Sequence, residues 1–594
     1  MRCSSVVAGL LLIAIVSPVP AWSGDNGVTG RVELAAEARL RRPVAMAWSP
    51  DRSALLVANS RTGTISVLDV ETLGVTREVP VGERLAAMVQ VPGTNSYLLL
   101  DDVAHQLLVV RWIDWNLEVT SRQPVPHFPY RVAVDTGNGS CYVTSRWTRQ
   151  LTRFHLRFDG SGDSSALTLQ RDGDVVLPFP AGELLPLTDH GSVVVAHAFG
   201  GDIAVVDSDD MSVRHVHRLP DHNIRSIART RNGEQLLMSC QRLNPLARGD
   251  FDDLDWGILL TNGVRVVDVD DLLDSGCDLA ETSEIESMKI PSDAAGDPGP
   301  ILIHPRGRML ICLSGVAEVA IGGEDFIAMD RHEVGERPVA AAVSQDGERF
   351  YVAGMLSDTV TVLDLSGPLW RRTIPLGPPA ELTAADRGEV LFYDARLSHD
   401  LWMSCHSCHA DGHTVDRIVD TLGDGDYGAP KRIPSLLGVA RTGPWAWNGR
   451  KPRLEDQVRM SVARTLHGVP LDDEQVADLT TFLETLELPD LPPLEDDSES
   501  VARGREVFAQ AGCAECHAGP DYTSADAYDV GLIDEQGRSR FNPPSLRGVS
   551  LRSAWLHDAR ATTLESIFVE HGHPRAGAVD QADLADLLAF LRSL

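Results

Sequence analysis

The chain has 594 residues, of which 53 are lysine or arginine and 85 are aspartate or glutamate, so its formal net charge is −32. This length predicts several folded units, and a hydrophobic fraction of 43% is enough to build packed cores. Such an acidic chain argues against nucleic-acid binding, because the phosphates would repel it, and suits either general solubility or a basic protein partner.

The N-terminus has the features of an export signal. Arg2 precedes a short apolar run over residues 6–16, and the small-residue stretch "SPVPAWSG" follows it. The run is too short to cross a bilayer, so we assign residues 1–23 as a Sec-type signal peptide. We therefore expect a periplasmic or otherwise exported protein with no transmembrane span in its mature form.

A repeated theme fills the next part of the chain. The stretch "RPVAMAWSPDRSALLVANSRTGTISVLD", which begins at Arg42, recurs as "RPVAAAVSQDGERFYVAGMLSDTVTVLD" from Arg337, with weaker copies between them. Apolar strands separated by Gly, Asp or Asn turns at a period near 40 residues are typical of four-stranded propeller blades. We predict an all-β propeller of about seven blades over residues 29–378, with a long insertion at 243–298 within or after the fifth blade.

The remainder contains an internal duplication. "PSLLGVARTGPWAWNGRKPRLEDQV" (434–458) aligns without gaps on "PSLRGVSLRSAWLHDARATTLESIF" (544–568), and "VADLTTFLETL" (476–486) pairs with "LADLLAFLRSL" (584–594). The apolar spacing of the second pair predicts amphipathic helices. Two helical domains are therefore expected, over residues 380–488 and 500–594, joined by an acidic, proline-rich linker at 489–499.

Each helical domain holds one Cys-x-x-Cys-His motif. The residues are Cys405, Cys408 and His409 in the first domain, and Cys513, Cys516 and His517 in the second. In an exported chain this spacing is the attachment signature of c-type haem, in which two thiols bond the vinyl groups and the histidine ligates the iron. Zinc would need four ligands per site, and a redox dithiol would need a βαβ context. We predict two covalent haems in two class I-like cytochrome c domains.

Four cysteines remain in the predicted propeller: Cys141, Cys240, Cys277 and Cys312. Because unligated thiols are unusual outside the cytoplasm, we expect structural disulfides, although the sequence does not give their connectivity.

Residues 388–594 resemble the bacterial dihaem cytochrome c peroxidase and MauG family. The resemblance rests on "RGEVLFYDARLSHDLWMSCHSCH", "WNGRKPRLEDQ" and "PPSLRGVSLRSAWLHDARATTLESIF". The propeller segment resembles the YVTN family through its "VANxxxxTVSVLD"-like stretches. The first resemblance implies a high-spin haem that meets peroxide, a low-spin haem that feeds electrons, and a tryptophan between them.

The resemblance carries over to four residues beyond the attachment motifs. Trp447 matches the inter-haem tryptophan, Gln457 matches a distal glutamine, and His467 aligns near the distal catalytic glutamate. A histidine could serve there as a general base, or it could coordinate the iron and close the site. His571 stands where the family places the sixth ligand of haem two, and His573 is its rival.

Two positions depart from the family pattern. Asp424 stands where family members carry a displaceable distal histidine, which predicts an open iron at haem one. Arg432 replaces an asparagine that helps to bind calcium between the domains, so calcium is doubtful.

These features favour a peroxidase-like enzyme that reduces hydrogen peroxide with electrons from a small cytochrome c or cupredoxin. One alternative is MauG-like oxidation of side chains in a partner protein, with the propeller as a docking platform. Another is a dihaem electron carrier or redox sensor without catalysis, if His467 closes haem one. A fourth hypothesis places a further cofactor inside the propeller on His197, His222 and His304.

Overall fold

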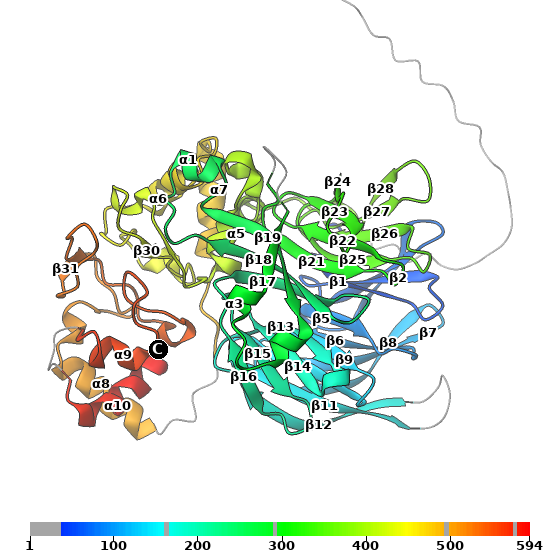
Figure 1. Cartoon of the computed structure of the whole chain (residues 1–594), viewed down its shortest axis with the longest axis horizontal. Helices are drawn as coiled ribbons and strands as arrows, with labels where there is room; N and C mark the ends of the chain where they lie inside the picture. The colour runs from blue at the N-terminus through cyan, green and yellow to red at the C-terminus, as the bar shows by residue number, and fades with distance from the viewer. Residues whose placement is uncertain (1–36, 160–165, 289–293, 492–497, 574–578) are drawn as a thin grey trace, which may run out of the picture.

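The computed structural model describes residues 37–159, 166–288, 294–491, 498–573 and 579–594. The predicted signal peptide lies outside these residues, as does the 492–497 part of the predicted linker. Within the described ranges, no helix is both long enough and apolar enough to cross a membrane. Figure 1 shows two parts, a ring of strands and a smaller helical part packed against one side of it.

Seven four-stranded antiparallel sheets form the predicted propeller, and each sheet uses four consecutive strands. The first three blades contain β1 (Pro43–Trp48), β2 (Ala54–Asn59), β3 (Thr64–Asp69), β4 (Gly74–Pro80), β5 (Leu85–Gln90), β6 (Ser96–Asp101), β7 (Gln106–Ile113), β8 (Asn116–Pro124), β9 (Pro129–Asp135), β10 (Ser140–Ser145), β11 (Gln150–Asp159) and β12 (Ala166–Val176). The fourth and fifth contain β13 (Ala181–Leu187), β14 (Ser192–His197), β15 (Ile203–Asp207), β16 (Val213–His217), β17 (His222–Arg229), β18 (Gln235–Leu243), β19 (Leu260–Asp268) and β20 (Glu284–Ser287). The last two contain β21 (Pro298–Ile303), β22 (Arg308–Leu313), β23 (Glu318–Gly323), β24 (Asp330–Glu333), β25 (Pro338–Val343), β26 (Arg349–Gly354), β27 (Thr359–Asp364) and β28 (Trp370–Pro375).

Strand position within a blade explains the sequence pattern. The second strands, such as β2 and β6, are buried along their whole length because neighbouring blades cover both faces. The fourth strand of the second blade, β8, alternates between exposed and less exposed residues because it forms the outer edge. This is why the second strands give the clearest apolar runs.

The ring closes where β1 meets β25. The carboxylate of Asp358 accepts hydrogen bonds from the backbone N–H groups of Arg41 and Arg42, each at 2.7 Å. The indole of Trp48 donates to the Val343 carbonyl at 3.1 Å. The first and seventh blades are thus joined by side-chain contacts, since each sheet consists of consecutive strands only.

The predicted insertion lies within the fifth blade. One excursion between β18 and β19 carries helix α1 (Phe251–Asp255), and a second one before β20 carries α2 (Val269–Leu273) and α3 (Leu279–Thr282). We call residues 244–259 the blade-five loop, because it reaches the helical part of the molecule.

The expectation of disulfides in the propeller is wrong. All four of its cysteines are unpaired, and Cys141, Cys240 and Cys312 are buried in the second strands of different blades. Burial raises the pKa of Cys141 and of Cys312 to about 12, so these thiols stay neutral and pack as small apolar groups.

The helical part contains two similar domains. The first has α4 (Ala384–Phe392), α5 (Cys405–Cys408), α6 (Leu454–Met460) and α7 (Asp473–Glu484), with the strand pair β29 (Ile418–Val419) and β30 (Lys431–Arg432). The second has α8 (Ser498–Gln510), α9 (Leu564–Val569) and α10 (Gln581–Arg592), with the strand pair β31 (Tyr528–Asp529) and β32 (Arg540–Phe541). Short turns of helix connect them: η2 (Ala395–Leu397), η3 (His399–Leu401), η4 (Ala410–Gly412), η5 (Leu422–Asp424), η6 (Val439–Arg441), the π-helical η7 (Ser461–Thr465), η8 (Cys513–Glu515) and η9 (Val549–Leu551).

The first and last helices of each domain cross in the same way. A Cβ atom added to Gly388 on α4 would lie 2.1 Å from the Asp478 carbonyl oxygen on α7, and one added to Gly504 on α8 would lie 1.9 Å from that of Asp586 on α10. Only glycine permits such an approach. The preceding arginine in α4, Arg387, pairs with the Asp478 carboxylate at 2.7 Å, and α8 and α10 make an equivalent pair. The two domains thus share one architecture.

Candidate functional site

The first attachment motif consists of helix α5 and the residue that follows it in domain one. Its histidine, His409, follows the helix directly, and its Nδ1 lies 2.9 Å from the Pro434 carbonyl oxygen. Donation from Nδ1 to a carbonyl fixes the tautomer and leaves Nε2 available for a metal. Burial lowers the pKa of His409 to about 4, which keeps the imidazole neutral, as a ligand must be.

The second motif has the same geometry. The Nδ1 of His517 lies 3.1 Å from the Tyr522 carbonyl oxygen, and burial again lowers the pKa of this histidine to about 4. Cys513, Cys516 and His517 line one mainly apolar cavity of domain two, together with side chains such as Leu532 and Leu587. Both motifs therefore fit a covalent haem.

His573 faces His517 in this cavity. The centres of the two rings are 6.4 Å apart. An iron between two imidazoles, with metal–nitrogen bonds of about 2 Å, would separate the ring centres by about 6 Å. His573 lines the cavity and His571 does not, although the Nε2 of His571 is also buried without a hydrogen-bond partner among the described residues. We propose His573 as the ligand in place of His571. The two histidines are two positions apart, beyond the end of α9 at Val569, and therefore point differently.

Trp447 lies at the interface of the two domains. It lines the cavity of haem two, while its indole donates to the Arg432 carbonyl at 2.9 Å within domain one. Its own carbonyl accepts from the Asn542 backbone N–H of domain two at 2.8 Å. Trp447 thus contacts both domains, and its location between the haems stays a prediction.

Arg432 occupies a buried place between the domains. Its guanidinium contacts the Asp416 carboxylate at 3.3 Å and the Leu556 carbonyl at 3.2 Å. Carboxylate and carbonyl oxygens are the ligands that calcium prefers, and here an internal cation already uses them. Calcium between the domains therefore stays doubtful.

Gln457 lies on α6, one turn before the π-helical η7. Its Nε2 lies 3.1 Å from Ser461 Oγ, while its Oε1 is buried without a hydrogen-bond partner among the described residues. A buried amide oxygen without a donor is costly, which favours a polar ligand at this place. π-Helical turns are frequent at functional sites.

His467 lies in a contact between domain one and the propeller. Its Nε2 lies 2.9 Å from the Gly249 carbonyl oxygen, and its ring packs 6.0 Å from Phe251, both on the blade-five loop. A ring nitrogen that donates to a carbonyl does not accept a proton. The loop, which the alignment with the helical family does not include, thus holds this histidine in a contact between propeller and domain one.

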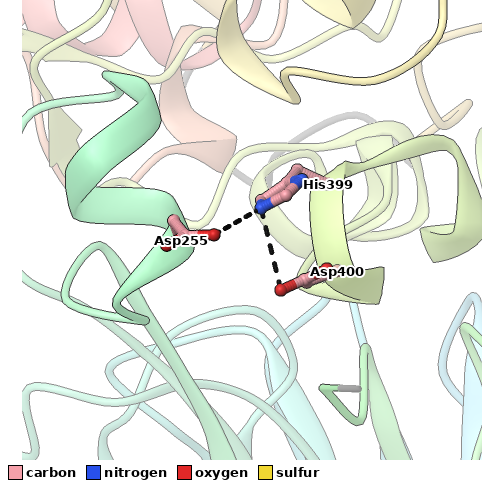
Figure 2. Close-up of side chains that lie close together, drawn as sticks. All are labelled: Asp255, His399 and Asp400. Carbon is pink, nitrogen blue, oxygen red and sulfur yellow. Dashed lines mark hydrogen bonds and ion pairs between the residues drawn. The ribbon is translucent and has the colours of Figure 1, made fainter. Parts of the chain in front are cut away.

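Figure 2 shows a second contact of the blade-five loop, made by Asp255, His399 and Asp400. The Nε2 of His399 lies 2.8 Å from an Asp255 carboxylate oxygen and 3.7 Å from one of Asp400. The three ligand atoms are close enough for a metal, but exposed acidic groups gather in this way without one. We interpret the cluster as an ion pair that joins α1 to η3.

Two further histidines of domain one and Asp424 also have partners. His406 contacts the Arg225 guanidinium at 3.2 Å, and His413 lies 3.2 Å from the Leu551 carbonyl oxygen. Asp424 pairs with Lys431 at 3.3 Å and with Arg538 at 2.7 Å. Each histidine of domain one other than His409, and the aspartate at the former ligand position, thus has a partner away from the attachment motif.

The propeller contacts the attachment segment of haem one through ion pairs. Asp411, two residues after His409, pairs with Arg146 at 3.1 Å, Arg225 at 3.0 Å and Arg337 at 3.6 Å. These arginines come from the third, fifth and seventh blades, which can meet only near the propeller axis. Arg225 and its neighbours hold the pKa of the Asp411 carboxyl well below its usual range, against the effect of burial.

Further contacts of the propeller reach α5 itself. The Nε2 of His222 lies 3.1 Å from the Ser407 carbonyl oxygen, and the Ser407 hydroxyl donates to the Asp297 carboxylate at 2.5 Å. His197 and His304 instead accept backbone N–H groups of their own loops. The structure does not bring these three histidines together, and so gives no support to a cofactor inside the propeller.

Comparisons with known proteins agree with this geometry. Residues 383–487 match the family of di-haem cytochrome c peroxidases, and residues 501–594 match the cytochrome c family. The chain is 28% identical over 270 residues to the methylamine utilization protein MauG of Methylorubrum extorquens, an alignment that covers 35% of this chain and 76% of the relative. It is 24% identical over 307 residues to the cytochrome c551 peroxidase of Nitrosomonas europaea, with 42% and 92% covered.

A solved structure of hydrazine synthase from Kuenenia stuttgartiensis aligns with a TM-score of 0.47 at 16% identity, over 57% of this chain and 99% of the other. This similarity is too distant to bear on function. The family matches and the two attachment motifs, by contrast, fall on the same residues. The C-terminal third of the chain is therefore similar to the di-haem cytochrome c peroxidases and carries two covalent c-type haems. The protein is a peroxidase-like oxidoreductase joined to a seven-bladed β-propeller.

Proposed function

We propose that this protein is an exported peroxidase that reduces hydrogen peroxide at haem one and receives electrons through haem two. One observation carries the proposal: the two sites differ on their distal sides. His573 faces His517 at a ring separation of 6.4 Å, whereas the other histidines of domain one are held by other groups. One closed and one open iron is the arrangement that a two-site peroxidase needs.

When bound, the haem of domain one would supply the ferric iron at which peroxide is reduced. His409 would hold that iron from the proximal side, with its ring fixed by the Pro434 carbonyl. The unpartnered Oε1 of Gln457 would accept a hydrogen bond from the peroxide and orient it. His467 has no role in this proposal, because its Nε2 is committed to the Gly249 carbonyl.

Trp447 provides the contact between the sites. Its ring lines the cavity of haem two, and its backbone and indole are each fixed by a hydrogen bond at 2.8 to 2.9 Å. A rigid aromatic group between the sites suits electron transfer. We propose a small cytochrome c or cupredoxin as the electron donor, and an exported location because covalent haem and the apolar run at 6–16 occur together.

Peroxide consumption by the holoprotein with a reduced small cytochrome c or cupredoxin tests this function. His409→Ala should abolish turnover while the absorption spectrum of haem two remains. Gln457→Ala should lower the rate constant for the reaction with peroxide by about tenfold, the effect of losing one hydrogen bond that orients the peroxide. Full turnover by His409→Ala would contradict the proposal. Peroxide-dependent modification of a partner protein with little donor oxidation would favour the MauG-like alternative.

A further inference from the structure

A large cavity lies between the propeller and both cytochrome domains. Its volume is about 2040 Å³, and its walls come from the third to fifth blades, the segment 413–418 after the first attachment motif, and the segment 547–555 of domain two. Pockets for small molecules usually measure about 300–1,000 Å³. The space is therefore ample for a ligand.

The charge of this cavity is opposite to that of the whole chain. Six arginines and four aspartates line it, while acidic residues outnumber basic ones by 85 to 53 in the sequence. A basic recess in a strongly acidic protein concentrates anions at that place.

Three of these arginines have only backbone carbonyls as partners. Arg149 donates to Ser550 at 2.6 Å, Arg417 donates to Leu219 and Asp221 at 2.9 and 2.7 Å, and Arg552 donates to Ser545 at 2.9 Å. Within the described ranges none of the three forms an ion pair, and the Nε atoms of Arg417 and Arg552 are buried without an acceptor.

Asp202 and Asp416 also line the cavity and favour the charged form of Arg417, but neither forms an ion pair with it. The Asp416 carboxylate is already paired with Arg432 and with the Ser553 backbone N–H. Burial lowers the pKa of Arg149 and of Arg417, and lowers that of Arg552 to about 9. A desolvated guanidinium without a counter-ion is unfavourable, and an anionic ligand would relieve this cost.

Flat aromatic groups line the same cavity as the arginines. The Trp147 ring packs 5.0 Å from the Phe199 ring and 5.0 Å from the His413 ring, and Phe179 stacks on His197 at 5.2 Å. Burial lowers the pKa of both histidines to about 3, so they are uncharged and add to the apolar wall. Arg149, Arg417 and His197 all line this cavity.

The cavity is also next to the haem-two pocket. Arg552, Trp555 and Leu564 line both spaces. A ligand in the cavity would thus lie one layer of side chains from the pocket of haem two.

We propose that this cavity binds an organic anion with a carboxylate group and an aromatic body. The carboxylate lies against Arg417 and Arg149, and the ring packs against Trp147 and Phe199. The binding requires no peroxide and does not depend on the proposed peroxidase function, so each of the two proposals can fail separately.

Isothermal titration of the ferric holoprotein, without peroxide, tests this binding. The probes are phenylacetate and its neutral analogue phenylacetamide, which have the same ring but differ in charge. We expect one phenylacetate per chain, bound at least tenfold more tightly than the amide. Equal affinity for the two probes, or no binding of phenylacetate, would overturn the proposal.

Variants locate the site. Arg417→Gln and Arg149→Gln should each weaken phenylacetate binding by about tenfold, the effect of losing one charge-assisted hydrogen bond. Arg371→Gln is the matched control. Arg371 lies on β28 of the seventh blade, does not line the cavity, and pairs with Glu333 at 2.9 Å. The two arginine variants probe different walls, so misfolding of one leaves the other as a test. Unchanged binding in a folded Arg417→Gln or Arg149→Gln protein, or an equal loss in Arg371→Gln, would contradict the assignment.

Discussion

At the scale of single residues, the attachment motifs could be predicted and the distal groups could not. The Cys-x-x-Cys-His spacing is local, so Cys405, Cys408 and His409 follow from the sequence alone. The distal side depends on contacts over long separations. The Nε2 of His467 contacts the carbonyl of Gly249, which lies more than two hundred positions earlier. No local sequence pattern reveals this contact.

His571 and His573 are the two candidates for the second iron ligand of haem two. His573→Ala should convert haem two from low spin to high spin, because it removes the imidazole that faces His517. His571→Ala is the matched control and should leave the spectrum unchanged, since that side chain does not line the pocket. Electron paramagnetic resonance of the two ferric variants distinguishes them. A spin change in His571→Ala alone would reverse the assignment.

At the scale of elements, the segment from α5 to η4 joins the propeller to haem one. The sequence predicts both parts but not their contact, because Asp411 carries no signal that three arginines from separate blades surround it. The blade-five loop adds a second junction through Asp255 and His399. The propeller is thus a structural component of the haem-one site rather than only a platform beside it.

Asp411→Asn should destabilise this junction. It leaves three arginines without their shared carboxylate, and removal of one partner from a buried ion pair costs about 3–5 kcal/mol. Glu348→Gln is the control, because Glu348 pairs with one similarly exposed arginine, Arg308 at 3.0 Å, and should cost at most about 1 kcal/mol. Denaturant unfolding followed by tryptophan fluorescence gives both values. Equal effects would contradict the role of Asp411.

The crossing of α4 and α7 gives a further prediction. Gly388→Ala places a methyl group 2.1 Å from the Asp478 carbonyl oxygen, so the helices must separate, at a cost of about 1–3 kcal/mol in the free energy of unfolding. Gly367→Ala is the control, since nothing lies within 4 Å of the added atom. Thermal unfolding followed through the absorbance of haem one measures the effect. An unchanged midpoint in Gly388→Ala would show that the crossing is not tight.

At the scale of the whole molecule, the sequence predicts the architecture well. The repeat period gives seven blades, and the internal duplication gives two helical domains, because both signals recur along the chain. The interface between the propeller and the cytochrome domains could not be predicted, because it depends on tertiary contacts between unrelated segments. The large arginine-lined cavity forms only at that interface.

We propose that haem one is open and haem two is closed. This proposal rests on the ring separation of 6.4 Å between His517 and His573 and on the engagement of the other histidines of domain one. Low-temperature electron paramagnetic resonance of the ferric holoprotein tests it most directly. An open haem one and a closed haem two should give one high-spin and one low-spin signal. Two low-spin signals in the resting protein would contradict the proposal and would favour a dihaem electron carrier.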